Sequence, residues 1–504
     1  MKAFKLLLGV SIASLSIGAA VAADLPTKKD APPPAPAKVQ CWGAFTDWFY
    51  ASPTDCPLSL AGVTFYGQID MGVGYMTQLS TLNSGNPSGV NYLNSKQNHG
   101  GGWTLAPNAL SQSNVGLKIS EPIAGDFKFI GDMNFGFDPY TLSFANGPGS
   151  LQSQNFTTQW QQQANADSSR WNSFINSRAY IGVSSATYGT AEFGRIYTFE
   201  NTLFSAYDPM NGAYAFGLIG GTGTQTYGNG VTQTGRYNTA VQYVYDYNKI
   251  VHAGGQVQLG GYGNDNGMRN GYQLNLGGTY ASFSVDGVYA YAQDAVAFAT
   301  YGSPQKPPIF QDNLKATLAN ISAFSLLGKY QYQALTVYGG YMHSTLSNPS
   351  DPYAGGFTTA GVTVLPGAVT SNAYNINKVL QTAWLGAKYG ILSNLDVSAA
   401  YYHTWQNTYD TNPSTAPGGN CAAFSTQAGT KKYIAGSPNV IGQGTVKGDC
   451  AGTIDVVGAL LDYRPIKRVD TYVGVEWSDF GGGLASGFPS TSNTAFTGGV
   501  RLTF

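Results

Sequence analysis

Apolar and polar side chains alternate over most of this chain, which is typical of β-strands with one apolar and one polar face. Between Val63 and Tyr75, for example, the odd-numbered positions are mainly apolar and the even-numbered positions are polar or glycine. The pattern predicts strands at residues 63–75, 115–119, 127–137, 179–183, 191–197, 237–247, 272–280, 283–291, 324–332, 335–341, 383–389, 395–405, 457–463, 472–477 and 495–504. Each is near the roughly 9–11 residues that a tilted strand needs to cross a membrane.

The connections between these strands alternate in length. Short turns are predicted at residues 121–125, 187–189, 247–248, 281–282, 333–334, 390–393 and 464–467. Long loops rich in Gly, Asn, Ser and Thr are predicted at residues 77–112, 138–176, 198–235, 263–270, 294–321, 345–377, 407–452 and 481–493. Outer-membrane barrels have an even number of strands, short periplasmic turns and long external loops. The sequence therefore predicts an all-β fold, a transmembrane antiparallel β-barrel of about 16 strands.

Charged residues test this arrangement, because a Lys or Arg that faced lipid in mid-bilayer would cost about 2–4 kcal/mol. Nearly all strand charges share parity with the polar face, which is expected to line the barrel interior, or lumen. The expected lumen charges include Asp70, Lys118, Asp132, Arg178, Arg236, Lys329, Lys388, Glu476 and Arg501. Arg195 is an exception, since it shares parity with Phe193, so we expect a β-bulge or a strand end at Arg195.

The last predicted strand ends with the aromatic residue Phe504 at the carboxyl terminus. A barrel in lipid has no open edge, so this strand is expected to pair with the first one. The pattern resembles the assembly signal of bacterial outer-membrane barrels. The resemblance implies contact with the barrel assembly machinery, outer-membrane lipid and lipopolysaccharide.

The amino-terminal part has the features of an exported protein. Residues 1–22 read as a signal peptide, residues 23–62 as a Pro-rich leader with a Cys-bracketed segment, and residues 63–504 as the barrel. Charged residues make up only 11% of the chain and the formal net charge is -1, so no basic patch suggests a nucleic-acid partner.

The four cysteines form two local pairs, Cys41 with Cys56 and Cys421 with Cys450. Four cysteines allow three connectivities, and local disulfides are the simplest because each pair brackets a loop-like segment. A metal site is the weaker alternative, since no CxxC or paired-His spacing accompanies them. We expect no cofactor.

Three regions carry a family resemblance. The segment from Cys41 to Cys56 (CWGAFTDWFYASPTDC), followed by Tyr66-Gly67 in the first strand, resembles the start of the alphaproteobacterial, rhizobial-type outer-membrane porins. The stretches RAYIGV from Arg178 and YGTAEFGR ending at Arg195 are similar to the strand pair before the constriction loop of general porins. The resemblance implies a homotrimer of sixteen-stranded barrels, each with its third loop folded into the lumen. Where the family often has a basic residue after Gly67, this chain has Gln68, so relatives do not indicate its ion selectivity.

The third long loop suggests a hypothesis for the pore. Arg178, Arg195 and Arg236 on the wall are expected to face Glu200 and Asp208 on the loop across a narrow constriction. The expected function is a water-filled channel for passive diffusion of ions and small hydrophilic solutes.

Other functions remain open. A substrate-selective channel, for example for sugars, would need a line of aromatic residues along the lumen, for which Tyr66, Tyr180 and Trp384 have the right parity. A secreted β-rich adhesin would need polar outer faces. An enzyme is not expected, because the four histidines have no HExxH spacing and there is no GxSxG or P-loop motif.

Overall fold

The computed structural model describes residues 41–79, 92, 100–142, 144, 175–217, 235–259, 270–295, 319–347, 357–359, 362–364, 376–408, 451–482 and 490–504. These residues belong to one compact unit, Gln40–Phe504. The predicted signal peptide and the Cys421–Cys450 pair lie outside the described residues. No helix in the described part of the chain has the length and apolarity to span a bilayer.

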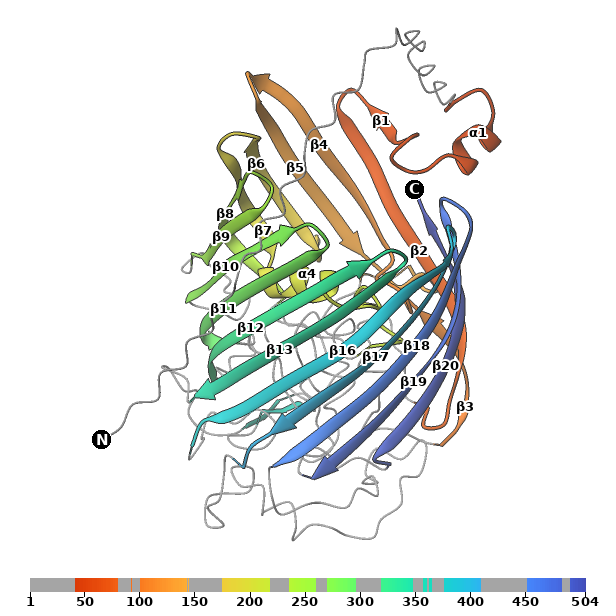
Figure 1. Ribbon diagram of the computed structural model, residues 1–504, viewed down its shortest axis with the longest axis vertical. Helices are drawn as coiled ribbons and strands as arrows, with labels where there is room; N and C mark the ends of the chain where they lie inside the picture. The colour runs from red at the N-terminus through yellow and green to blue at the C-terminus, as the bar shows by residue number, and fades with distance from the viewer. Residues whose placement is uncertain are drawn as a thin grey trace, which may run out of the picture. The chain divides into compact units, whose positions relative to one another are not determined.

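The secondary structure consists almost entirely of strands (Figure 1). The described residues include the helices α1 (Phe45–Tyr50) and α4 (Phe199–Ala206). The strands are β1 (Leu58–Leu60), β2 (Val63–Met76), β3 (Gly102–Pro107), β4 (Asn114–Ala124), β5 (Phe127–Gly136), β6 (Arg178–Ser185), β7 (Gly189–Tyr197), β8 (Arg236–Tyr247), β9 (Val251–Gln258), β10 (Asn270–Tyr280), β11 (Phe283–Ala295), β12 (Ala319–Tyr332), β13 (Leu335–Ser347), β14 (Phe357–Thr359), β15 (Val362–Val364), β16 (Lys378–Leu392), β17 (Leu395–Gln406), β18 (Gly452–Ile466), β19 (Val469–Gly482) and β20 (Ser492–Thr503).

The strands close into one antiparallel barrel. Each wall strand pairs with its neighbour in sequence, and β20 returns to pair with β2. The sheet has eighteen strands. β1 shares one edge of β2 with β20, and β3 shares the other edge of β2 with β4, so β1 and β3 are not counted as separate wall strands. Sixteen strands therefore form the wall in the described residues. The predicted sixteen-stranded antiparallel barrel is therefore confirmed.

The two faces of the wall differ as the alternation predicts. One face carries exposed apolar side chains such as Val73, Leu117, Ile181, Leu274 and Leu385, which is the face that contacts lipid in a membrane barrel. The opposite face points into the lumen and holds most of the buried polar and charged groups. Because transmembrane barrels keep short turns on the periplasmic side, the ends of β4, β6 and β18 lie at that side.

The edge of β2 is covered by two different segments. The pairing of β20 with β2 begins at Gln68 and Thr503, and Phe504 exchanges two backbone hydrogen bonds with Gly67, both 2.9 Å long. On the amino-terminal side of Gly67, β1 pairs with the same edge of β2, with Leu60 opposite Val63. Backbone groups that would otherwise be unpaired at this edge are therefore bonded.

The wall strand next to β2 is interrupted. β3 pairs with the carboxyl-terminal half of β2, and β4 pairs with its amino-terminal half. Between them, residues 108–113 lie opposite only Ile69 and Asp70. The Asp70 carboxylate accepts backbone hydrogen bonds from Leu110 (2.7 Å) and Ser111 (2.9 Å), and one from the Tyr472 hydroxyl (2.6 Å). This insertion therefore turns toward the lumen and is held there by Asp70.

Some elements were not predicted. The strand β9 was missed, because its outward positions include Ala253 and Gly255, which give little alternation. The strand β3 and the helix α4 lie in segments predicted as loops. The β18 strand also continues through Pro465, where a turn was predicted.

The amino-terminal segment is attached to the periplasmic end of the barrel. Its disulfide joins Cys41 and Cys56, as expected. The Arg468 guanidinium, in the β18–β19 turn, donates hydrogen bonds to the carbonyl oxygens of Trp48 (2.9 Å), Ser52 (3.2 Å) and Cys56 (2.7 Å). It also lies 4.3 Å from the centre of a Trp48 ring. One side chain thus holds the whole disulfide-closed loop.

We expect Arg468→Met to release this loop, because hydrogen bonds from a charged group contribute about 1.5–3 kcal/mol each. Backbone amide exchange of residues 45–56 should become faster, while exchange in the wall strands stays the same. The matched control is Lys467→Met, which removes an exposed ion pair to Asp55, a kind of contact that contributes little to stability. Equal exchange rates in the two variants would contradict the role assigned to Arg468.

Candidate pore constriction

The connection between β7 and β8 enters the lumen. Its first described part, residues 198–217, begins with Thr198, whose hydroxyl caps α4 by accepting a hydrogen bond from the Asn201 backbone N–H. The α4 helix is followed by tight turns through Asp208 and Met210. The side chains that contact this loop come from the lumen face of the wall, so the third long loop is folded inward (Figure 1).

The carboxyl end of α4 is bonded to the wall on several sides. The Lys329 ammonium donates to the Ala206 carbonyl (3.3 Å), where a cation is favourable because the last carbonyls of a helix carry partial negative charge. The Trp384 indole N–H donates to the Tyr207 carbonyl (3.1 Å), and the Tyr207 hydroxyl donates to Asp286 (2.5 Å). These contacts fix the middle of the loop to β11, β12 and β16.

Asp208 is a structural residue of the loop. Its carboxylate accepts backbone hydrogen bonds from Met210 (3.2 Å) and Gly212 (3.0 Å) and one from the Tyr402 hydroxyl on β17. Only 2% of the residue is exposed. Burial raises the pKa of Asp208, and the hydrogen bond from Tyr402 offsets part of this rise.

The part of the loop around residues 209–217 fits against glycines of the wall. A Cβ atom at Gly458 would lie 1.8 Å from the Phe216 carbonyl oxygen, and one at Gly386 would lie 2.6 Å from the Pro209 ring. The backbone N–H of Ala215 donates to the Ala109 carbonyl (2.9 Å) of the inward insertion. The loop therefore spans the lumen from β7 to the β3–β4 junction.

Glu200 is buried in the first turn of α4. Its backbone N–H donates to the Gln273 side chain (3.1 Å), and its carboxylate lies 3.4 Å from the Gln273 amide nitrogen. Burial raises the pKa of Glu200 from 4.5 to about 8. The folded loop consequently holds this carboxyl group mainly in the neutral form at neutral pH.

Two of the predicted arginines lie together where the loop leaves the wall. The guanidinium groups of Arg178 and Arg236 lie 5.4 Å and 4.9 Å from the ring centre of Tyr197, the last residue of β7. Arg178 forms an ion pair with Asp132 (2.7 Å), whose other oxygen accepts a hydrogen bond from the Tyr66 hydroxyl (2.5 Å). The Arg178 side chain is 32% exposed, so its charge reaches lumen water.

A comparison with protein families matches residues 19–483 to the family described as Gram-negative porin. This chain belongs to the Gram-negative porin family. As a porin with a closed barrel it is an outer-membrane channel.

Two solved structures have a similar fold. An anion-selective porin from Comamonas acidovorans has a TM-score of 0.51 and 13% sequence identity, covering 88% of this chain and 99% of that chain. OmpT of Vibrio cholerae with loop L8 deleted, an outer membrane protein, has a TM-score of 0.51, 14% identity and the same coverage. At these identities the likeness shows the fold alone. A search of curated proteins found no match.

The third predicted arginine of this porin has a different role. Arg195 is 7% exposed, and its guanidinium donates to the carbonyl oxygens of Asn176 (2.8 Å) and Ser177 (3.1 Å). A register shift between Gly194 and Ile196 accounts for its departure from the alternation. Arg195 thus connects the start of β6 with the end of β7.

The structure corrects the expected pairing of charges across the constriction. Glu200 and Asp208 are buried and bonded to the wall or to the loop itself, so neither faces Arg178 across water. The physical reasons differ: the Asp208 carboxylate binds backbone N–H groups of a tight turn, and the Glu200 carboxylate lies beside the Gln273 amide in a buried site. Arg195 is also excluded from the lumen surface by its bonds to backbone carbonyls.

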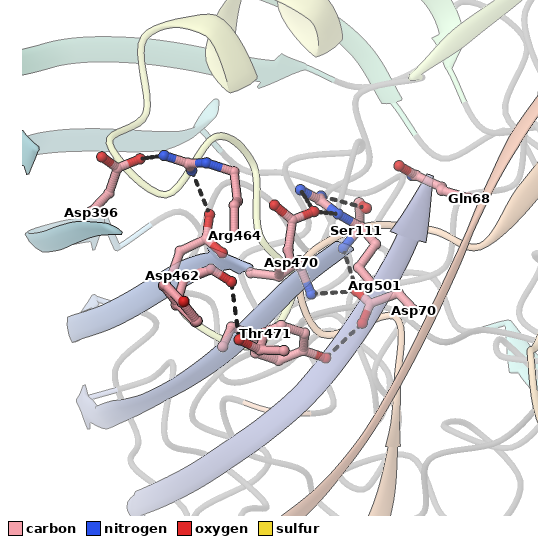
Figure 2. A network of polar contacts seen from close by, with 12 residues as sticks. Gln68, Asp70, Ser111, Asp396, Asp462, Arg464, Asp470, Thr471 and Arg501 are labelled. Carbon is pink, nitrogen blue, oxygen red and sulfur yellow. Dashed lines mark hydrogen bonds and ion pairs between the residues drawn. The ribbon is translucent and has the colours of Figure 1, made fainter. Parts of the chain in front are cut away.

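A second group of charges was largely missed from the sequence (Figure 2). Asp396 on β17 pairs with Arg464 on β18 (2.8 Å), and Arg464 also pairs with Asp462 (3.1 Å). Asp470 on β19 pairs with Arg501 on β20 (2.8 Å). These five residues form a row across four neighbouring strands near the periplasmic end of the lumen, here called the acid–base row. Asp462 has lumen parity within the predicted strand 457–463, and Arg464 and Asp470 would have been identified in the same way if β18 and β19 had been predicted at full length.

The remaining predicted lumen charges serve different purposes. Arg501 also donates to the Ser111 hydroxyl (3.0 Å) of the inward insertion. The Lys118 ammonium is exposed and lies 5.9 Å from the Tyr66 ring centre. The positive charge of Lys388 lowers the pKa of Asp208 and so offsets part of the rise caused by burial. Glu476, by contrast, is 1% exposed on the lumen face of β19.

Gly458→Ala is expected to displace the constriction loop, because the new methyl group would overlap the Phe216 backbone. Overpacking of this kind typically costs about 1–3 kcal/mol. Single-channel conductance and current noise should increase while the barrel still folds. Gly328→Ala is the control, since its Cβ would be 3.9 Å from the nearest atom, the Ser284 carbonyl oxygen. Unchanged conductance in Gly458→Ala would show that the loop does not narrow the pore.

The raised pKa of Glu200 predicts a pH-dependent loop. Because the folded pKa of about 8 exceeds the ordinary 4.5, ionisation increasingly destabilises the bound loop as pH rises through this range. Wild-type channels should therefore be noisier at about pH 9 than at about pH 6. Glu200→Gln cannot ionise and should remove this difference, whereas Glu192→Gln on the wall should keep it. Equal pH dependence in wild type and Glu200→Gln would refute the prediction.

Proposed function

We propose that this porin is a general diffusion channel for ions and small hydrophilic solutes, narrowed by the β7–β8 loop. The supporting observation is the network that holds residues 198–217 inside the lumen, from the Thr198 cap to the Ala215–Ala109 hydrogen bond. Such a loop restricts the cross-section without closing the barrel to water.

The charge that borders the narrow region is proposed to come mainly from Arg178 and Arg236. Both lie against Tyr197, directly before the loop begins, and Arg178 is the more exposed of the two. The negative partner of Arg178 is Asp132 on the neighbouring strand rather than a carboxylate on the loop. The electric field at the narrow region therefore arises within the wall, between oppositely charged groups on adjacent strands.

The acid–base row is proposed as the second charged surface along the solute path. It combines three carboxylates with two guanidinium groups in three ion pairs, whose N–O distances are 2.8 Å, 3.1 Å and 2.8 Å. Closely paired charges produce strong local dipoles but little net potential. Such a surface would bind hydrated solutes without selecting strongly by net charge.

We further propose that the chain belongs to the rhizobial-type subgroup and assembles as a homotrimer. The Cys41–Cys56 disulfide lies in the segment that carries the subgroup resemblance. One similar structure, with 13% identity, is described as a trimer form of a Vibrio cholerae protein. Outer-membrane lipid, lipopolysaccharide and the barrel assembly machinery are the other proposed partners, and no enzymatic activity is part of the proposal.

A sugar-selective channel is less well supported. Trp384 contacts Phe204 and donates to the Tyr207 carbonyl, and Tyr66 donates to Asp132, so both are engaged with protein groups. A selective channel would show a current block that saturates with added sugar, and a general channel would not.

Removing the exposed guanidinium should change ion selectivity. Arg178→Met leaves Asp132 as an unbalanced negative charge, so the reversal potential in a salt gradient should shift toward cation preference. Lys249→Met removes the same formal charge from an exposed turn and should leave the reversal potential unchanged. If the two variants behave alike, Arg178 does not border the solute path.

A further inference from the structure

The disulfide-closed segment presents aromatic side chains that no other described residue covers. Trp42 is 65% exposed, Phe45 71% and Tyr50 62%. Phe45 stacks on Phe49 at a ring-centre distance of 5.5 Å, and Tyr50 contacts Phe49 at 5.9 Å, so Phe45 and Tyr50 belong to one cluster of rings, with Trp42 three residues before Phe45 in the same disulfide-closed loop. Exposed aromatic groups of this kind mark an interaction surface when they are gathered and rigidly held.

This cluster is held rigidly. The disulfide closes the loop that carries the cluster. Arg468, in the β18–β19 turn, donates hydrogen bonds to three carbonyl groups of this loop. The Asp47 carboxylate accepts a hydrogen bond from the Ala44 backbone N–H (2.9 Å) at the start of α1. Figure 1 shows α1 at the end of the barrel where the carboxyl terminus and the β18–β19 turn lie.

The segment is continuous with the lipid-facing surface. In the β1–β2 register, Leu60 lies opposite Val63 and Leu58 opposite Phe65, so the two leucines extend the outward face of β2. Leu60 is 83% exposed, and Phe65 stacks on Phe504 at 5.4 Å. An apolar outer face thus runs from the wall into β1, which leads directly to the aromatic cluster.

This continuity identifies the surface that the cluster contacts. Short turns mark the periplasmic end of an outer-membrane barrel, where the wall meets the headgroups of the inner leaflet. Aromatic residues are enriched at such interfaces because their rings combine an apolar body with a polar edge. A short helix with exposed aromatic residues at this end of the barrel has the features of an interfacial anchor.

We propose that residues 41–60 form a periplasmic-leaflet anchor, in which Trp42, Phe45, Tyr50 and Leu60 insert at the boundary between phospholipid headgroups and acyl chains. The anchor is independent of the channel proposal, since none of its residues lines the lumen. Its occupant is phospholipid rather than a protein partner or a cell-wall glycan. The disulfide and Arg468 orient the anchor relative to the barrel.

Site-specific photocrosslinking in cells can test this assignment. A benzophenone amino acid replaces Phe45 in the full-length chain, and adducts are identified by mass spectrometry after irradiation. The positive control carries the same probe at Leu274 on the lipid-facing wall, and the control at the same end of the barrel carries it at Thr187 in the β6–β7 turn, where the Thr187 backbone N–H is bonded to Asp126. Heat-modifiable electrophoretic mobility checks that each variant forms a barrel.

A phospholipid adduct at position 45 and at position 274, but not at position 187, supports the anchor. An adduct at position 45 to a second copy of the chain, to another protein or to peptidoglycan would overturn it. So would the absence of an adduct at position 45 when position 274 reacts with lipid. Trp42→Ser combined with Tyr50→Ser should lower the phospholipid adduct at position 45 while leaving single-channel conductance unchanged.

Discussion

The whole structure depends on the requirement that backbone N–H and C=O groups in a bilayer be hydrogen-bonded within the protein. Sixteen strands satisfy it around most of the wall by pairing with their neighbours in sequence. The critical strand is β2. One edge of β2 pairs with β20 over its carboxyl-terminal part and with β1 over its amino-terminal part. The carboxyl-terminal Phe504 bonds to Gly67 close to the point where these two segments meet. Closure therefore joins residues from both ends of the folded chain.

The same requirement shapes the lumen. A loop that crosses it carries turns whose backbone groups also need partners, and the wall supplies them through Lys329, Trp384 and Tyr402. Asp70 and Asp208 bind backbone N–H groups of the two inward segments. Several carboxylates inside this barrel thus maintain irregular backbone and do not carry the field that acts on solutes.

The sequence was sufficient to predict the fold because a barrel wall has a period of two with opposite requirements on its faces. Parity alone assigned Asp132 and Arg178 to the lumen, where they form an ion pair. It failed where the residues are small, as in β9, and at Pro465, which reads as a turn signal although β18 continues past it with a register shift. The orientations of Glu200 and Asp208 could not be predicted, because they depend on contacts with Gln273 and Tyr402 that are distant in sequence.

The inward segments do not fill the barrel evenly. Within the part of the chain that the structure describes, the main buried cluster joins loop residues such as Phe204 and Phe216 to β12, β13, β16–β20 and the β3 side of the wall. The strands from β4 to β8 contribute none of its members. The main cluster therefore lies to one side of the barrel axis, away from the strands where Arg178 pairs with Asp132 beside the start of the loop.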